Sequence, residues 1–481
     1  MASLKRKIGY GFGDMASSMF WKIFSYYLPF FYSNVFGLSL LDAGVLVMIT
    51  RIWDAVSDPM MGVIADRTDT RMGKYRPYLL WFSIPFAVCG VLLFTTPDFA
   101  YAGKLVWAYI TYILMMTVYT GINVPYGAML GVITADSKEK TVFSSYRMFF
   151  AYGGSFIALA AWEPLCDLFG KDFGMTATTS WQVSMCVIAG ACLLLFLLCF
   201  AMTREVVHSK SVVSIGSDFK ALLKNSPWWL LIGAALCFNL FNTVRGATVA
   251  YFFADVIGAD ASMWLFGLSV LFYSGLFLSI GEVANMVGVA LTVPIASRLG
   301  KKTTFILVNL LLVVLSIGFF FLPVSSVGFF MMLVFQICIS ILTGVMSPLI
   351  WSMYADVADY SEERFHTAST GLIFSSSSMA QKFGGAIGGA AVLWLLSACG
   401  YVAGSDTAVQ QTPEAISCLW ALMTFIPACV AALAVFVVCY YPLTTARVNE
   451  IAESLKKRRA AVDASTEEAK DVAENFDNIN N

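Results

Sequence analysis

The sequence predicts an all-α integral membrane protein with twelve transmembrane helices, from its composition, its length and the number of its apolar stretches. Of the 481 residues, 59% are hydrophobic and only 13% are charged, whereas a soluble chain has about 25% charged residues. The chain has too few polar residues to cover the surface of a soluble globular protein, which excludes a soluble enzyme. A helix that crosses a bilayer takes about 20 mostly apolar residues, so this length allows twelve such helices with short loops.

Twelve apolar stretches follow one another along the chain, and a polar segment separates the sixth from the seventh. We therefore expect an N-terminal six-helix bundle over 1–203, a cytoplasmic linker over 204–226, a C-terminal six-helix bundle over 227–441 and a cytoplasmic tail over 442–481. The stretches lie near 10–34, 41–65, 77–97, 104–130, 143–165, 181–203, 227–256, 263–296, 303–322, 328–352, 370–398 and 415–441.

The distribution of basic residues predicts the orientation. Most of the 30 lysines and arginines lie in the two termini and the even-numbered loops, whereas the odd-numbered loops hold only Lys104 and Lys171. Because short cytoplasmic loops carry an excess of Lys and Arg, both termini and the central linker are expected in the cytoplasm. A net charge of -1 gives no indication of a nucleic-acid partner.

A short basic turn occurs at the same place in each half, after the second and the eighth stretch. The two segments read GVIADRTDTRMGK (62–74) and PIASRLGKK (294–302). Two related six-helix halves joined by a linker are the plan of major-facilitator transporters, whose substrate site lies between the halves near the bilayer midplane. We expect the first turn to act as a cytoplasmic gate and not to touch substrate. Its gating residues would be Asp66, Arg67, Arg71 and Lys74.

The second stretch carries three ionisable residues, Arg51, Asp54 and Asp58, at a spacing that places them on one helix face. An ionised side chain at the centre of a membrane-spanning helix is energetically costly, so each of the three is expected to pair with another group or to serve a function. Pro59 also lacks the N–H that would bond to the carbonyl of Ala55. Two carboxylates and a loose carbonyl suit a hard cation such as sodium, and a close carboxylate pair can instead share a proton. Alternatively, the two aspartates only neutralise Arg51 and another basic residue.

The fourth stretch offers a polar stripe around a proline. Tyr119, Asn123 and Tyr126 recur at helical spacing with Thr120 beside them. Aromatic faces and an amide together suit a sugar, whereas hydrogen bonding between helices is an equally good interpretation.

Further ionisable residues fall in other apolar stretches. Arg147 and Lys382 could donate to sugar hydroxyls or balance the two aspartates. Asp14 lies near the cytoplasmic entry of the first helix, and Lys22, Arg245 and Glu282 could lie at helix ends. The only two histidines, His208 and His366, lie in predicted loops, which excludes a histidine proton relay. The glycines in GGAIGG (384–389) indicate close helix packing, not a phosphate loop.

With these residues in place, the chain resembles the glycoside-pentoside-hexuronide:cation symporters, which include the melibiose, glucuronide and xyloside carriers. The resemblance covers nearly the whole chain in the right order and is specific for the family but not for a substrate. It rests on YGFGD (10–14), RIWDAVSDP (51–59), RMGKYRP (71–77), NVPY (123–126), Arg147, ADVADY (355–360) and Lys382.

The resemblance implies a major-facilitator fold and two sets of site residues. The cation site would comprise Asp54, Asp58, Thr120 and Asn123, with the two aspartates as ligands if the ion is sodium. The sugar site would comprise Asp14, Ser17, Ser18, Tyr119, Asn123, Tyr126, Arg147 and Lys382.

Three positions depart from the family pattern. Ser18 and Asn123 stand where the melibiose carrier has aspartates, which disfavours a galactoside. Ala368 stands near the usual arginine of the inner gate.

The expected function is cation-coupled symport, with Na⁺ or H⁺, of a glycoside, pentoside or hexuronide by alternating access. The expected setting is the bacterial inner membrane, with lipid around a monomeric chain. No cofactor other than the coupling ion is expected. Two alternatives are a uniporter, for a sugar or a lipid-like substrate, and a membrane sensor that binds sugar without moving it. Accumulation against a gradient separates the three.

Overall fold

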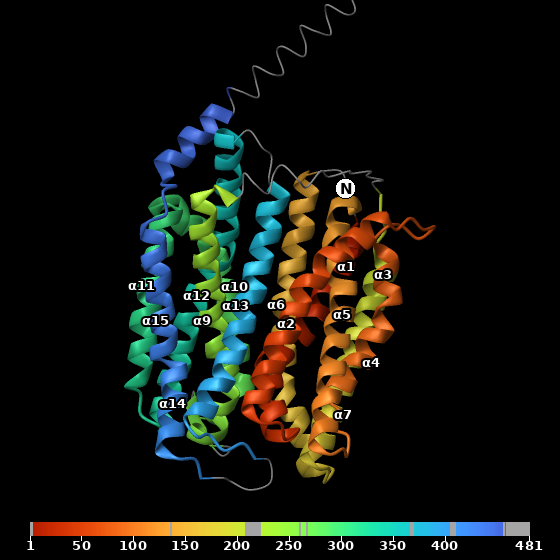
Figure 1. The fold of residues 1–481 in the computed structure, drawn as a ribbon, viewed down its shortest axis with the longest axis vertical. Helices are drawn as coiled ribbons and strands as arrows, with labels where there is room; N and C mark the ends of the chain where they lie inside the picture. Colours follow the sequence, from red (N-terminus) through yellow and green to blue (C-terminus); the bar gives the residue numbers. More distant parts are fainter. Residues whose placement is uncertain are drawn as a thin grey trace, which may run out of the picture.

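The computed structural model describes residues 3–134, 137–206, 223–258, 261–265, 268–365, 370–404, 410–455 and 457. Most of the predicted linker, both histidines, Ala368 and the tail beyond 457 lie outside these ranges. The described chain is almost entirely helical and forms two bundles that stand side by side (Figure 1).

The N-terminal bundle contains seven α-helices and two short π-helical turns in the described ranges. They are α1 (Leu4–Phe30), η1 (Phe31–Val35), α2 (Leu40–Arg67), α3 (Arg76–Trp81), α4 (Ser83–Leu93), α5 (Tyr101–Ile133), α6 (Ser137–Asp167), η2 (Leu168–Asp172) and α7 (Ala177–Met202).

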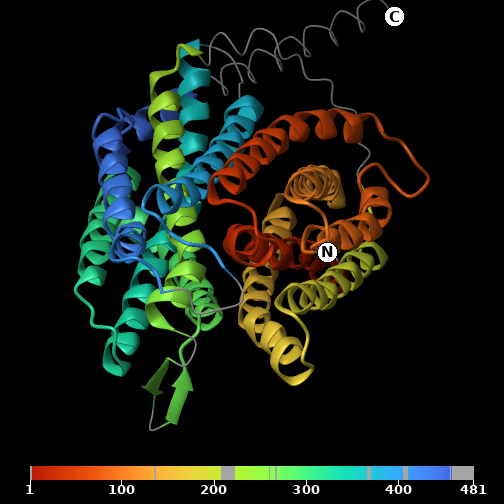
Figure 2. The ribbon, with the colours of Figure 1, turned by 60° about the horizontal axis from the view of Figure 1, so that its bottom comes forward.

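The C-terminal bundle begins at Ser226 and includes a small antiparallel hairpin, in which Ser262 of β1 pairs with Leu271 of β2. The hairpin projects from one end of the bundle (Figure 2). The elements are α9 (Ser226–Phe252), η3 (Phe253–Ile257), β1 (Ser262–Leu265), β2 (Leu268–Leu271), α10 (Ser274–Leu299), α11 (Lys301–Phe320), α12 (Ser326–Phe365), α13 (Thr370–Ala398), α14 (Pro413–Met423) and α15 (Phe425–Cys439).

The prediction of twelve membrane-crossing helices is confirmed when α3–α4 and α14–α15 are each counted as one broken helix. Within the described ranges, eight of the twelve are long and apolar enough by composition alone to cross a membrane. The other four are α1, α2, α3–α4 and α6. Of these, α1 and α2 carry buried charged residues and α6 carries the half-buried Arg147 and Glu163. The remaining one, α3–α4, is interrupted after Trp81. Hydropathy is therefore lowest in the bundle that supplies most of the polar site.

The break between α14 and α15 has an identifiable cause. Pro427 has no N–H to offer the carbonyl of Met423, four residues earlier, so the helical ladder is interrupted there. Thr424 at the junction turns its hydroxyl back to the carbonyl of Trp420, at 2.6 Å. The freed Met423 carbonyl instead accepts a hydrogen bond from Arg245 of α9, at 2.9 Å.

Hydrogen bonds join the two bundles at the end away from the N-terminus. Tyr27 of α1 lies 3.0 Å from the hydroxyl of Ser274 at the start of α10, and that hydroxyl also donates to Glu163 of α6. Ser33 reaches Tyr251 at 2.7 Å. The N-terminus, the loop 68–75 and the helical segment 445–455 lie at the opposite end (Figure 1). Which end faces the cytoplasm stays a prediction.

Candidate functional site

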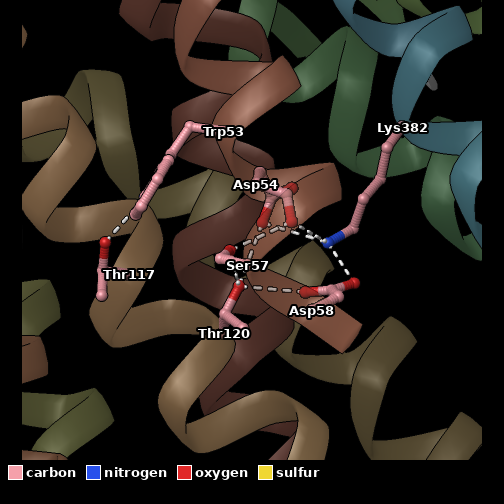
Figure 3. Close-up of polar contacts among 7 residues, drawn as sticks. All are labelled: Trp53, Asp54, Ser57, Asp58, Thr117, Thr120 and Lys382. Carbon is pink, nitrogen blue, oxygen red and sulfur yellow. Dashed lines mark hydrogen bonds and ion pairs between the residues drawn. The ribbon is translucent and has the colours of Figure 1, made fainter. Parts of the chain in front are cut away.

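Two carboxylates of α2 meet a lysine of α13 between the bundles. The Nζ atom of Lys382 lies 3.0 Å from Oδ1 of Asp54 and forms a short ion pair with Asp58. Figure 3 shows both acidic side chains turned toward this lysine. The Asp54 side chain is completely buried, whereas that of Asp58 is 26% exposed. We call Asp54, Asp58 and Lys382 the carboxylate cluster.

Two hydroxyls complete the surroundings of the carboxylate cluster. Thr120 of α5 lies 3.2 Å from Oδ1 of Asp54 and 3.0 Å from Oδ1 of Asp58, so it bridges the two aspartates. Ser57 lies 3.2 Å from the Thr120 hydroxyl. Ser57 was not expected from the sequence, although a small polar residue between two intramembrane aspartates is a usable signal. Carboxylate and hydroxyl oxygens are the ligand types that hard cations prefer.

The charges of the carboxylate cluster do not balance. One lysine faces two aspartates, and Oδ2 of the buried Asp54 has no hydrogen-bond partner among the described residues. An unpartnered carboxylate oxygen in such a place is energetically costly unless water, a proton or a cation satisfies it. The arrangement is chemically able to take up one small positive charge.

Arg51 does not join the carboxylate cluster. Its guanidinium carbon lies 4.4 Å from the ring centroid of Trp21 and 4.8 Å from that of Phe24, both on α1. Cation–π contact of this kind stabilises a desolvated arginine by roughly 2 kcal/mol. The spacing predicts that Arg51 shares a helix face with the two aspartates, but its guanidinium turns to the aromatic rings of α1 instead of joining them. The neutralising partner that the structure provides is Lys382.

Glycines allow α13 to approach its neighbours. A Cβ atom on Gly389 would lie 3.1 Å from Val47 of α2, and one on Gly388 would lie 2.9 Å from Thr243 of α9. The glycine run thus packs against helices, as the sequence indicated. Close approach of α13 to α2 is what places Lys382 within reach of the aspartates.

An ion pair joins α1 and α6 within the N-terminal bundle. Nε of Arg147 lies 2.8 Å from Oδ2 of Asp14, and the guanidinium carbon lies 5.3 Å from the ring centroid of Tyr126. The Tyr126 hydroxyl donates to the carbonyl of Tyr10 at 2.6 Å. Asp14 and Arg147 are thus brought together, as two residues of the expected sugar site, whereas the hydroxyl of Tyr126 is engaged in packing between helices.

The remaining expected sugar-site residues lie near this ion pair along α1 and α5. Ser17 is buried and its hydroxyl has no partner among the described residues, while Ser18 is half-buried. The ring of Tyr119 lies 5.0 Å from that of Trp21. Asn123 is half-buried and makes no hydrogen bond to Asp54 or Asp58 in the part of the chain that the structure describes. Its place in the cation site stays a prediction.

The expected gate lies in the turn after α2. Arg67 ends the helix, and Arg71 is exposed in the loop. The side chain of Asp66 lies outside what the structure describes. The loop is held by Glu205, which follows α7 and accepts hydrogen bonds from the backbone N–H groups of Lys74, Tyr75 and Arg76 at 2.8, 2.7 and 2.6 Å. Glu205 was missed because nothing in the local sequence links it to a loop some 130 residues earlier.

We expect Glu205→Ala to loosen this loop. Loss of three hydrogen bonds to a carboxylate should cost about 2 to 3 kcal/mol locally, after allowance for solvent exposure. Trypsin should then cut the purified protein after Arg71 or Lys74 at least about tenfold faster than wild type. Glu414→Ala, at an exposed position of α14, is the matched control. Equal cleavage rates in all three proteins would show that Glu205 does not hold the loop.

Two six-helix bundles with an unbalanced ion cluster between them define a secondary membrane transporter by fold and by site. Comparison with known proteins agrees. Residues 9–445 match the family model described as MFS/sugar transport protein. The chain belongs to this family, and it is a multi-pass membrane transporter and not an enzyme.

Curated relatives and solved structures extend this assignment. The chain is 36% identical over 461 residues to the putative glycoside/cation symporter YagG of Escherichia coli, which covers 95% of this chain and 96% of the relative. It is 31% identical to the isoprimeverose transporter of Lactiplantibacillus pentosus, with 98% and 95% covered. The crystal structure of tetrameric PepTSo2 superimposes with a TM-score of 0.66 at 12% identity over 92% of this chain and 99% of that one, which supports the fold alone.

Proposed function

We propose that this protein couples the uptake of a glycoside, pentoside or hexuronide to Na⁺ or H⁺, by alternating access in a bacterial inner membrane, as a monomer with both termini in the cytoplasm. The observation that carries the proposal is the carboxylate cluster. It places two aspartates of one bundle against one lysine of the other, and Oδ2 of the buried Asp54 has no partner among the residues that the structure describes. A cation entering there changes the electrostatic attraction between the bundles.

The coupling follows from competition for the aspartates. In the state described here, Lys382 neutralises one of the two negative charges from across the interface. A cation bound by Asp54, Asp58 and Thr120 would displace the ammonium group and free it to contact the substrate. Sugar and cation would then favour the same arrangement of the bundles, with a coupling free energy of about 1 to 3 kcal/mol, as between other linked sites.

The sugar would bind beside the Asp14–Arg147 pair. A carboxylate and a guanidinium together offer an acceptor and several donors to neighbouring hydroxyls, and Tyr119 and Trp21 supply aromatic faces close by. The names of the relatives, a glycoside/cation symporter and an isoprimeverose transporter, favour this substrate class. Ser18 and Asn123 disfavour a galactoside.

Proteoliposomes test the proposal directly. Radiolabelled xylosides, glucosides, glucuronides and galactosides are offered under an imposed sodium or proton gradient. We expect at least one xyloside, glucoside or glucuronide to accumulate above its external concentration, and Asp58→Cys to abolish this accumulation. Equilibration without accumulation would indicate a uniporter, and binding without flux would indicate a sensor; either result contradicts the proposal.

A further inference from the structure

Two cysteines meet where α13 and α14 approach each other, at the end of the C-terminal bundle away from the N-terminus (Figure 1). The Cys418 thiol of α14 donates to the carbonyl of Leu395 at 3.6 Å, and the backbone N–H of Cys399 donates to the same carbonyl at 3.0 Å. The Cys399 side chain lies within hydrogen-bond range of the Cys418 thiol. Both are free thiols in this structure. We call Cys399 and Cys418 the thiol pair.

The ends of two helices hold the backbone on both sides of the thiol pair. Gly400 ends α13 in the left-handed conformation, with φ of +72°, and the N–H of Tyr401 bonds back to the carbonyl of Leu396 at 3.0 Å, as is common at helix C-termini. At the start of α14, the Thr412 hydroxyl accepts from the N–H of Ala415 at 3.2 Å. The two cysteines therefore extend from fixed positions.

The loop that joins the two helices is already drawn together next to the thiol pair. The side chain of Gln411 accepts from the N–H of Val402 at 3.0 Å and donates to the carbonyl of Val402 at 2.8 Å. It also donates to Asp255 at 3.3 Å. A covalent link between the two sulfur atoms would close a loop of about 20 residues, a length at which a disulfide stabilises a folded chain appreciably.

The two thiols differ in their access to solvent. Cys399 is half-buried, whereas Cys418 is only 7% exposed. An accessible thiol beside a buried one is the arrangement in which the first is attacked by an external oxidant or attacks it, and the second completes the bond. A single buried cysteine such as Cys192, whose thiol donates to the carbonyl of Ala16 at 3.3 Å, offers no such second step.

We propose that Cys399 and Cys418 form a disulfide at the outer face of the membrane, and that it braces the loop carrying Tyr401. The Tyr401 hydroxyl accepts from Asn34 of the N-terminal bundle at 3.1 Å and donates to Asp255 at 2.6 Å. The disulfide therefore strengthens a loop that contacts both bundles. The inference rests on the proposed function, because cytoplasmic termini place this end in the periplasm, which is kept oxidising.

The oxidant is a periplasmic protein that carries a reducible disulfide. Cys399 loses its proton, and the thiolate attacks one sulfur of that disulfide, which forms a mixed disulfide and releases one thiolate of the oxidant. Cys418 then loses its proton and attacks the Cys399 sulfur, which forms the bond between the two cysteines and releases the second thiolate. The two protons end on the released thiolates, and two electrons pass to the oxidant.

The state of the thiol pair can be measured on the full-length protein in a bacterial host. Cells are quenched with acid, free thiols are alkylated, and the protein is purified without reductant and digested for mass spectrometry. We expect most chains to yield a peptide pair that links Cys399 to Cys418 and that separates on treatment with TCEP. Cys399→Ser should lose the linked pair. Cys429→Ser, at an exposed position of α15, is the matched control and should keep it.

The thermal midpoint of the purified protein tests the bracing of the loop. Reduction of wild type with TCEP should lower the midpoint by about 3 °C or more, since the closed loop is then released in the unfolded chain. The same treatment should not change the midpoint of Cys399→Ser, and should lower that of Cys429→Ser as it does that of wild type. A linked peptide pair without any change in midpoint on reduction would contradict the bracing.

Labelling from outside separates this inference from the proposed function. Spheroplasts are reduced with TCEP and treated with a sulfonated maleimide that does not cross the membrane, which should label Cys399. External labelling of Cys399 together with full alkylation of both thiols in the quenched cells would overturn the disulfide, while sugar accumulation in proteoliposomes would leave the proposed function intact. Labelling of Cys399 only after the membrane is permeabilised would contradict both the proposed orientation and the disulfide.

Discussion

Asp54→Asn is expected to abolish accumulation of sugar against its gradient while leaving a folded protein. The substitution removes the charge of a completely buried carboxylate whose Oδ1 lies 3.0 Å from Lys382. Lys382 and Asp58 then neutralise each other, and no net negative charge remains to attract a cation. An interaction with a charged ligand contributes about 1.5 to 3 kcal/mol, so cation affinity should fall by at least about tenfold.

Uptake in proteoliposomes under an imposed sodium or proton gradient measures this effect. Asp42→Asn is the matched control, because Asp42 lies in the first turn of the same helix and bonds to Ser39 and Tyr101 instead. The control should accumulate sugar as wild type does. Wild-type accumulation by Asp54→Asn would mean that the buried carboxylate has no part in coupling.

Arg147→Gln is expected to eliminate saturable sugar binding. The substitution removes the donors that face Asp14 at 2.8 Å and leaves that carboxylate buried without its partner. Arg147→Lys keeps the charge but cannot reproduce the forked geometry of the guanidinium. We therefore expect the lysine variant to bind at least about tenfold more weakly than wild type and the glutamine variant not to bind measurably.

A double variant separates binding from folding in this prediction. Asp14→Asn combined with Arg147→Gln leaves no unpaired charge, so the thermal midpoint of the purified protein should recover toward that of wild type. Calorimetric titration with the transported sugar should still detect no binding. Recovery of sugar affinity together with stability would show that the ion pair only holds α1 against α6.

The helix count was predictable because each membrane-crossing helix needs its own apolar stretch and because basic residues mark every second loop. The breaks at Trp81 and Thr424 were not predicted, since both lie within apolar stretches and hydropathy does not register a local interruption of the hydrogen-bond ladder. The sequence predicts a helix over the apolar stretch 263–296, but the structure places the β1–β2 hairpin at its start and begins α10 only at Ser274.

The site was predictable where its residues share one helix or match a pattern, as with Asp54 and Asp58. The pairing of residues across the interface between the two bundles was not predictable. Lys382 lies more than 320 residues from Asp58, and Glu282 lies 260 residues from Lys22, so only tertiary packing decides these partners. Arg51 shows a second limit of sequence-based prediction. Its spacing predicts the helix face that it shares with the aspartates, but not the direction of its long side chain, which turns to the aromatic rings of α1.

The claim that the carboxylate cluster holds the coupling cation is tested most directly by reciprocity of binding. Calorimetry on the purified protein gives sugar affinity at low and saturating sodium, and at low and high pH, and then cation affinity with and without sugar. The two ligands should strengthen each other by the same factor, about 5-fold to 150-fold, and the effect should vanish in Asp54→Asn. Sugar affinity that is independent of both sodium and pH in wild type would contradict the claim that the carboxylate cluster holds the coupling cation.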